Sequence, residues 1–179
     1  MLFNFLYLAS FDILPYENSG GDEKMELKVF PVYYGGKLMP WGKGAVAKGA
    51  KGFVWVAGAE GQDPTIAADG YELKGQEVAK GPEAQTKLCL EKLKAALEEM
   101  GSSLDKIVMM NWYIKGPFPD GIVYSPNFCP KVMEEFFKEH CPDRALDVNP
   151  VPIDLIGVAS LALKDMFVEI SCVAALSDD

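Results

Sequence analysis

The residue best suited to chemistry is Glu169, which lies in a strand-like run near the carboxyl end of the chain. This run, FVEISCVAAL at residues 167–176, otherwise consists mainly of apolar side chains. Alternation along a strand places Glu169 on the same face as Ser171 and Val173. If both faces are covered, burial raises the pKa of the carboxyl and makes it a candidate general base or hydrogen-bond acceptor in a cleft. The alternative is a glutamate on an edge strand that faces water.

Other residues that support catalysis or metal binding are sparse. His140 is the only histidine, which excludes a histidine-rich metal site. The pair His140-Cys141 is interpreted as a helix end, because neighbours in sequence point in different directions. The four cysteines have no CxxC spacing and are too few for a disulfide framework. A cysteine metal site would need residues distant in sequence, and the four cysteines fit the reducing conditions of a cytoplasmic location.

Two glycine-containing stretches imitate known motifs. GKGAVA at residues 42–47 has the glycines of a dinucleotide-binding turn, but the element expected after it is a strand and not a helix. We interpret it as a glycine-rich approach to a sheet. Residues 57–75 combine acidic side chains with glycines, yet the spacing is not that of an EF-hand, so this stretch is interpreted as a solvated loop.

The charge balance bears on the partners of the protein. The chain has 26 acidic and 17 basic residues, a net charge of -9, and a single arginine, Arg144. Phosphate binding depends on clustered lysines and arginines, so we expect no nucleic-acid partner. With 179 residues, of which 49% are hydrophobic, the chain is long enough for one compact domain.

Residues 1–24 are predicted to be an extension that precedes a domain formed by residues 25–179. The extension begins with apolar residues, but no basic residue precedes them and no small-residue cleavage site follows. It also falls short of the roughly 20 apolar residues that a membrane span needs, so we expect no membrane partner. Met25 is a plausible natural start; the alternative is that the extension forms an extra strand or a partner-binding arm.

The remaining sequence alternates between strand and helix signals. Helical periodicity is expected at residues 83–100 and 131–140, and strands at 27–34, 51–58, 106–116, 152–163 and 166–176. Pro31 indicates an edge or a bulge in the first strand, and residues 51–58 are expected to be a buried central strand. This order predicts an α+β sheet with two helices packed on one face. The apolar strands leave the other face to be buried by self-association.

Several segments in order resemble the RidA/YjgF family of reactive-intermediate deaminases, also called the endoribonuclease L-PSP family. They are FVWVAG, Gln85-Thr86, EEMGSSLDKIVMMNWYIKG, EEFFKEH, CPDR and VASLALKDMFVEISCVA, within about residues 38–175. The resemblance implies a chorismate-mutase-like fold and a homotrimer with clefts between neighbouring subunits. It also implies hydrolysis of 2-imino acids and their enamine tautomers to 2-keto acids and ammonia, without metal or cofactor.

The resemblance also assigns roles to particular residues. It implies that Glu169 positions the attacking water and that Trp41, where the family usually has tyrosine, lines the cleft. Ala57 and Gly58 fall on the first two positions of the family's Ser-Gly-Gln motif, so the serine hydroxyl is missing. The family's asparagine before the second helix becomes Pro130.

The family's arginine, which grips the substrate carboxylate, has two candidate positions. Spacing from Glu169 places it at Asp154, which would repel a carboxylate. The local Pro-Xaa-Arg pattern places it at Arg144, with about ten extra residues before the next strand. The alternative role for Arg144 is that of a helix-end cation that complements the helix dipole.

Two functions from different classes follow. The first is hydrolytic deamination of a small carboxylated imine or enamine, with Glu169 acting on water, Trp41 packing on the ligand, and Arg144 holding the carboxylate. The second is a non-catalytic trimeric protein that binds a metabolite in the same cleft. Ribonuclease activity, which the family name suggests, is disfavoured by the net charge.

Overall fold

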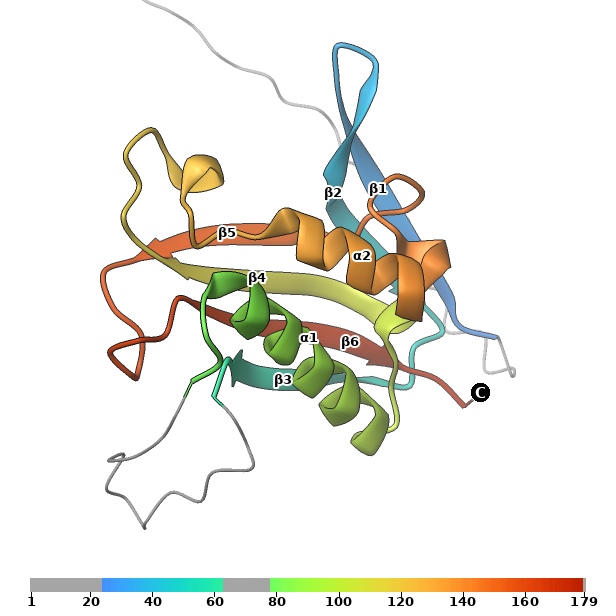
Figure 1. The fold of residues 1–179 in the computed structure, drawn as a ribbon. Helices are drawn as coiled ribbons and strands as arrows, with labels where there is room; N and C mark the ends of the chain where they lie inside the picture. The colour runs from blue at the N-terminus through green and yellow to red at the C-terminus, as the bar shows by residue number, and fades with distance from the viewer. Residues whose placement is uncertain (1–23, 63–77, 179) are drawn as a thin grey trace, which may run out of the picture.

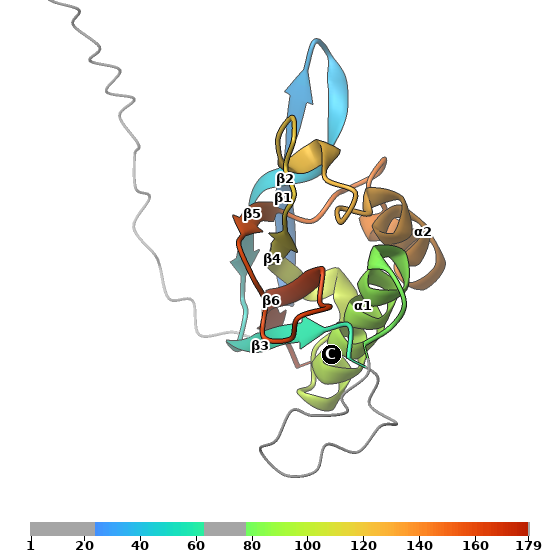
Figure 2. The ribbon, with the colours of Figure 1, turned by 60° about the vertical axis from the view of Figure 1, so that its left-hand side comes forward.

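The computed structural model describes residues 24–62 and 78–178. Its main sheet has the strand order β3-β6-β4-β5, formed by β3 (Gly52–Glu60), β6 (Val168–Leu176), β4 (Ile107–Lys115) and β5 (Ile153–Val158). β6 runs antiparallel to both β3 and β4, and β4 runs parallel to β5. Two helices, α1 (Pro82–Glu99) and α2 (Pro130–His140), lie on one face of this sheet (Figures 1 and 2). The predicted α+β sheet with helices on one face is confirmed.

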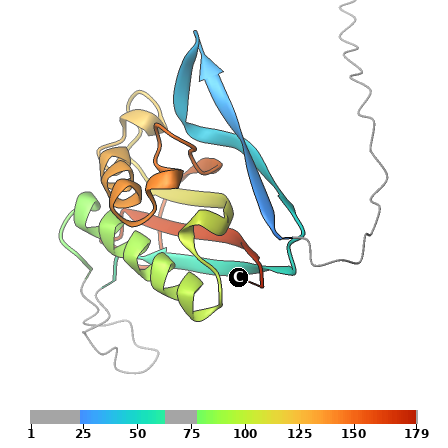
Figure 3. The ribbon, with the colours of Figure 1, turned by 90° about the vertical axis from the view of Figure 1, so that its right-hand side faces the viewer.

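A hairpin of β1 (Glu26–Tyr34) and β2 (Lys37–Lys48) extends beyond the main sheet (Figure 3). Gly35 and Gly36 form its turn with φ angles of 56° and 78°, a backbone conformation that favours glycine. The register shifts on both sides of Pro31, which confirms the predicted bulge.

The glycine-rich stretch at residues 42–47, interpreted from the sequence as a glycine-rich approach to a sheet, is itself part of strand β2. Gly42 allows a close crossing there, because its N–H donates to the carbonyl oxygen of Val151. A Cβ on Gly42 would lie 2.8 Å from Cγ1 of Val29 and 2.9 Å from the carbonyl oxygen of Pro150. Glycine is therefore found at this position of the strand because a larger residue would clash with Val29 and Pro150.

Both helices begin with proline at the first turn, where the missing N–H breaks no helical hydrogen bond. α2 ends at His140, as the sequence predicts. The helices bury leucines and phenylalanines against the sheet face formed by Met110, Trp112 and Ile114 of β4 and by Val168, Ile170 and Cys172 of β6. This layer is the core of the domain.

Residues 51–58 were expected to form a buried central strand, but the strand found there, β3, is an edge strand. Its partner β6 takes the inner position between β3 and β4, so Glu169 is not on an edge strand. On the sheet face opposite the helices, Phe53 is 42% and Trp55 70% exposed. We call this face, which also carries Glu169, Ser171 and Tyr113, the open face.

Candidate functional site

Glu169 lies on the open face of β6, beside the bulge of β3. The register of the β3–β6 pair shifts between Val56 and Ala59, which places Ala57 and Gly58 in the bulge. The side chain of Glu169 passes over Gly58: a Cβ on Gly58 would lie 2.5 Å from Cδ of Glu169 and closer still to Oε1. The structure thus brings together three of the five site residues predicted from the sequence: Ala57, Gly58 and Glu169.

The surroundings of Glu169 favour its protonated form. Its residue is half-buried, and burial raises the pKa of the carboxyl, as does the nearby negative charge of Glu60. Glu60 and Tyr113 are the register partners of Glu169 on the two adjacent strands. Sequence alternation could not reveal either neighbour, because it does not fix which strands are adjacent.

Trp41 lies in a different place, in an apolar pocket of about 450 Å³. The pocket is lined by Pro40, Trp41, Trp112, Val123, Phe128, Pro130, Met133, Ile153 and Leu155. We call it the Trp41 pocket. Its members Trp112 and Met133 belong to the core between the sheet and the helices, so it opens on the helix side and not on the open face. Within one chain, Trp41 and Glu169 therefore lie in different places, Trp41 in this pocket and Glu169 on the open face.

Arg144 is in neither location. It follows α2 in the 3₁₀ turn Pro142–Arg144, is 3% exposed, and its guanidinium donates to the carbonyl oxygens of Asp105, Ile107 and Asn149. Burial lowers the pKa of Arg144 from its ordinary value. The guanidinium thus ties the turn after α2 to the start of β4, whereas Glu169 pairs with Tyr113 near the other end of that strand.

Asp154, the other candidate for the family's arginine position, is exposed on β5. It is the register partner of Asn111, whose amide donates to Oγ of Ser171 over 3.3 Å. Paired residues share a sheet face, so Asp154 projects from the open face that also carries Glu169. The open face therefore carries a second acidic residue besides Glu169, and its position is one of the two candidates for the family's arginine.

Gln85 holds the segment that leads into β6, a role not predicted from the sequence, where the motif Gln85-Thr86 served only as part of the family resemblance. The fully buried amide of Gln85 donates to the carbonyl oxygens of Ala79 and Asp165 and accepts from the N–H of Phe167. These bonds fix the entry to β6 two residues before Glu169. Gly61 packs against Gln85, since a Cβ there would lie 2.5 Å from Cβ of Gln85.

The cysteines do not offer an activated thiol at this site. Burial raises the pKa of Cys89 and of Cys172 to about 12, so both remain protonated thiols at neutral pH. Among residues 24–62 and 78–178, no three His, Cys, Asp or Glu side chains are grouped so as to hold a metal ion. No helix in these ranges is long and apolar enough to cross a membrane.

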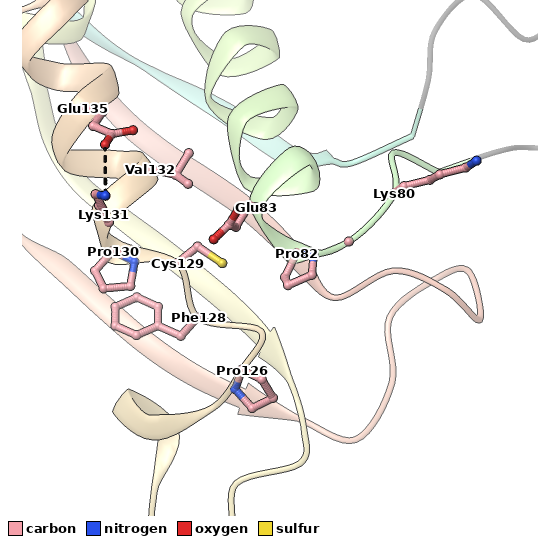
Figure 4. A pocket seen from close by; sticks show the side chains of 11 residues that line it. Lys80, Pro82, Glu83, Pro126, Phe128, Cys129, Pro130, Lys131, Val132 and Glu135 are labelled. Atoms are coloured by element: carbon pink, nitrogen blue, oxygen red, sulfur yellow. Dashed lines mark ion pairs between the residues drawn. The ribbon is translucent and has the colours of Figure 1, made fainter.

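A second cavity of about 480 Å³ lies where the first turns of α1 and α2 approach each other (Figure 4). Its charged lining residues are Lys80, Glu83, Lys131 and Glu135, of which Lys131 and Glu135 form an ion pair of 3.7 Å. None of the five site residues predicted from the sequence lines it. The candidate site is therefore assigned to Glu169 and the Trp41 pocket.

The mixed sheet with two helices on one face is a fold that the chain shares with Rid proteins. The model of the endoribonuclease L-PSP family matches residues 38–176. The chain therefore belongs to the RidA/L-PSP family, also called YjgF.

Solved structures support this fold. A protein of unknown function of the conserved Rid family, YyfB from Yersinia pestis, is 20% identical with a TM-score of 0.59 and covers 84% of this chain and 98% of its own. TdcF of E. coli with bound serine is 23% identical with a TM-score of 0.51, covering 87% and 99%. The YjgF gene product of E. coli is 23% identical with a TM-score of 0.50, covering 82% and 92%. No curated protein matches the chain.

Proposed function

We propose that the protein is a hydrolytic deaminase that converts small imines or their enamine tautomers to carbonyl compounds and ammonia. The observation that carries the proposal is the Glu169 carboxyl, half-buried on an inner strand and held over Gly58. Its raised pKa brings it closer to neutral pH, where a general base works best.

In the proposed reaction, the ionised Glu169 accepts a proton from water as the water oxygen bonds to the imine carbon. The imine nitrogen takes up a proton from solvent, which gives a tetrahedral carbinolamine. The carboxyl of Glu169 then returns its proton to the nitrogen, the C–N bond breaks, and the hydroxyl releases its proton to solvent as the C=O bond forms. The overall reaction consumes one imine and one water and yields one ketone and one ammonia.

The proposed cleft lies between copies of the chain in a homotrimer. Trp41 lines a pocket whose walls include the helix-side residues Trp112 and Met133, whereas Glu169 lies on the open face of the main sheet, so we infer that a ligand touching both needs two chains. Phe53 and Trp55 give the open face an exposed aromatic pair, with ring centroids 6.3 Å apart, that a second copy would bury. The family to which the chain belongs is typically oligomeric.

The substrates proposed for the test are 2-imino acids, in line with the small carboxylated metabolite that the family resemblance implies. The neighbouring structure of TdcF contains serine, a molecule of this size. Contact between the carboxylate and Arg144 would require the guanidinium to leave its three backbone carbonyls. The proposal therefore rests on Glu169 and Trp41 and assigns Arg144 no contact with substrate.

The test measures loss of 2-imino acids that an amino acid oxidase generates in situ from 2-aminobutyrate and from phenylalanine. We expect the protein to accelerate loss of at least one of them and Glu169→Gln to abolish the acceleration while assembly is unchanged. Glu91→Gln, an exposed substitution on α1, is the matched control. Equal acceleration by wild type and Glu169→Gln would refute the assignment.

A second candidate, a non-catalytic trimeric metabolite-binding protein, is favoured by the replacement of the family's serine with Ala57. An alanine methyl offers no hydrogen bond to a reacting group. This alternative predicts that keto acids raise the melting temperature of the protein while no imine loss is accelerated.

A further inference from the structure

The Trp41 pocket has a chemical character that differs from a carboxylate site. Its nine lining residues are all apolar or aromatic, and none is charged. It adjoins the cavity of Figure 4, with which it shares Phe128 and Pro130, but the charged residues line only that neighbouring cavity. A ligand in the Trp41 pocket therefore meets no cation from these walls.

Three aromatic rings form much of the pocket wall. Trp112 and Phe128 pack edge to face, with ring centroids 5.9 Å apart and ring planes at 84°. Trp41 packs edge to face on Tyr34, which does not line the pocket. Such walls favour flat apolar groups through area burial and ring contacts. The indole N–H of Trp112 has no acceptor among the described residues, but it is fully buried, so the wall contributes ring surface to the cavity and no accessible donor.

The cavity is large enough for a ring. A cavity of roughly 150 Å³ holds a benzene molecule, so about 450 Å³ leaves room for an aryl group with a short substituent. The one arginine that a carboxylate would seek is held elsewhere by three backbone carbonyls.

We propose that the Trp41 pocket takes an uncharged aromatic group. The substrate is then an imine or enamine with an aryl substituent and not a small aliphatic imino acid. Only the identification of this ligand as the substrate rests on the proposed deaminase function; the binding preference rests on the pocket itself.

The test compares the binding of two ketones to the full chain by isothermal titration calorimetry. Acetophenone represents the aryl class and 2-oxobutyrate the small carboxylated class. Because the ring buries more apolar area, we expect the dissociation constant for acetophenone to be at least about tenfold lower than that for 2-oxobutyrate. Binding of 2-oxobutyrate that is as tight or tighter would overturn the proposal.

A pair of variants locates the binding. Val123 lines the pocket and is 51% exposed, so Val123→Lys places an ammonium at the rim without burying it. We expect this change to weaken acetophenone binding at least about tenfold, because the ligand would have to displace a hydrated charge. Val148→Lys, at a position 62% exposed and outside the pocket, should leave binding unchanged. Equal affinities in the two variants would place acetophenone elsewhere and overturn the proposal.

These binding data separate the two proposals. Acetophenone binding that depends on Val123, without acceleration of any imine loss, would uphold the pocket assignment and remove the deaminase function. Turnover of 2-iminobutyrate that depends on Glu169, without acetophenone binding, would uphold the function and overturn the aryl preference.

Discussion

The carboxyl of Glu169 occupies the space that a side chain on Gly58 would need. A Cβ at Gly58 would lie 2.5 Å from Cδ and 2.7 Å from Cγ of Glu169. The β3 bulge thus provides a backbone surface against which the candidate catalytic carboxylate packs. The φ angle of Gly58 is not positive, so the backbone conformation does not require glycine there. The space that Glu169 occupies is what excludes a side chain at Gly58.

Gly58→Ala should therefore impair activity more than stability. The added methyl displaces the flexible end of Glu169, and a displacement of about 1 Å in a catalytic group costs about 100-fold in rate. The measurement is kcat for imine loss together with the melting temperature.

Gly61→Ala is the contrasting control for this prediction. There the new methyl meets Cβ and Cα of Gln85, which cannot swing away, so the melting temperature itself should fall. Gly58→Ala with unchanged kcat would contradict the placement of Glu169 in the reaction.

Neutralising Glu60 should shift the pH profile. The pKa of Glu169 is raised by burial first and by the negative charge of Glu60 second. Glu60→Gln removes the second cause, so the pKa of Glu169 falls and its ionised, active form persists to lower pH. The acidic limb of kcat/KM should accordingly move to lower pH, while Glu91→Gln leaves it in place. A limb that stays still or moves upward in Glu60→Gln would show that another group controls it.

Arg144→Ala should destabilise the protein. It removes the donors of three hydrogen bonds to carbonyl oxygens, of which the one to Ile107 is buried, at a cost of about 3 kcal/mol in the free energy of unfolding. Arg144→Lys should lie between wild type and alanine, because one ammonium cannot reproduce the planar fork. Unfolding by denaturant measures the free energy of unfolding of the wild type and of both variants. Unchanged stability combined with a raised KM for 2-imino acids would instead make Arg144 a substrate ligand.

Trp55→Asp should prevent assembly. Trp55 is 70% exposed on the open face next to Phe53, and a carboxylate at its position would be costly to bury between copies. Light scattering after size exclusion should give a trimer mass for wild type and a monomer mass for the variant. Met100→Asp, at the end of α1 and 47% exposed, should remain trimeric. A trimeric Trp55→Asp protein would exclude the open face as the contact.

The sequence predicted the elements well because each carries a local signal. Periodicity located α1 and α2, and β-branched and aromatic runs located β3, β4 and β6. β2 was missed because glycines are unusual in strands. The close packing of Gly42 against Val29 and Pro150, which explains one of them, is visible only in the folded chain. Strand order was out of reach for the same reason: nothing local in residues 52–60 distinguishes an edge from a central strand. The predicted extension at residues 1–24 lies almost entirely outside the described residues and stays a prediction.

The sequence could single out candidate residues but not their roles. A lone glutamate in an apolar strand made Glu169 a candidate, the family resemblance added Ala57 and Gly58, and the structure places the three together. The roles of these residues and of Trp41 remain predictions. The location of Arg144 could not be derived, because its partners are backbone carbonyls distant in sequence.

The central claim is that Glu169 of one copy acts on a substrate held in the Trp41 pocket of another. Glu169→Gln and Trp41→Ala should each be inactive as pure, assembled proteins. Hybrid oligomers made by co-expressing the two variants at equal levels contain clefts with both halves intact, and should recover up to about a quarter of wild-type imine hydrolysis, since pairing is random in a symmetric ring. Hybrids no more active than the separate variants would contradict a cleft shared between copies.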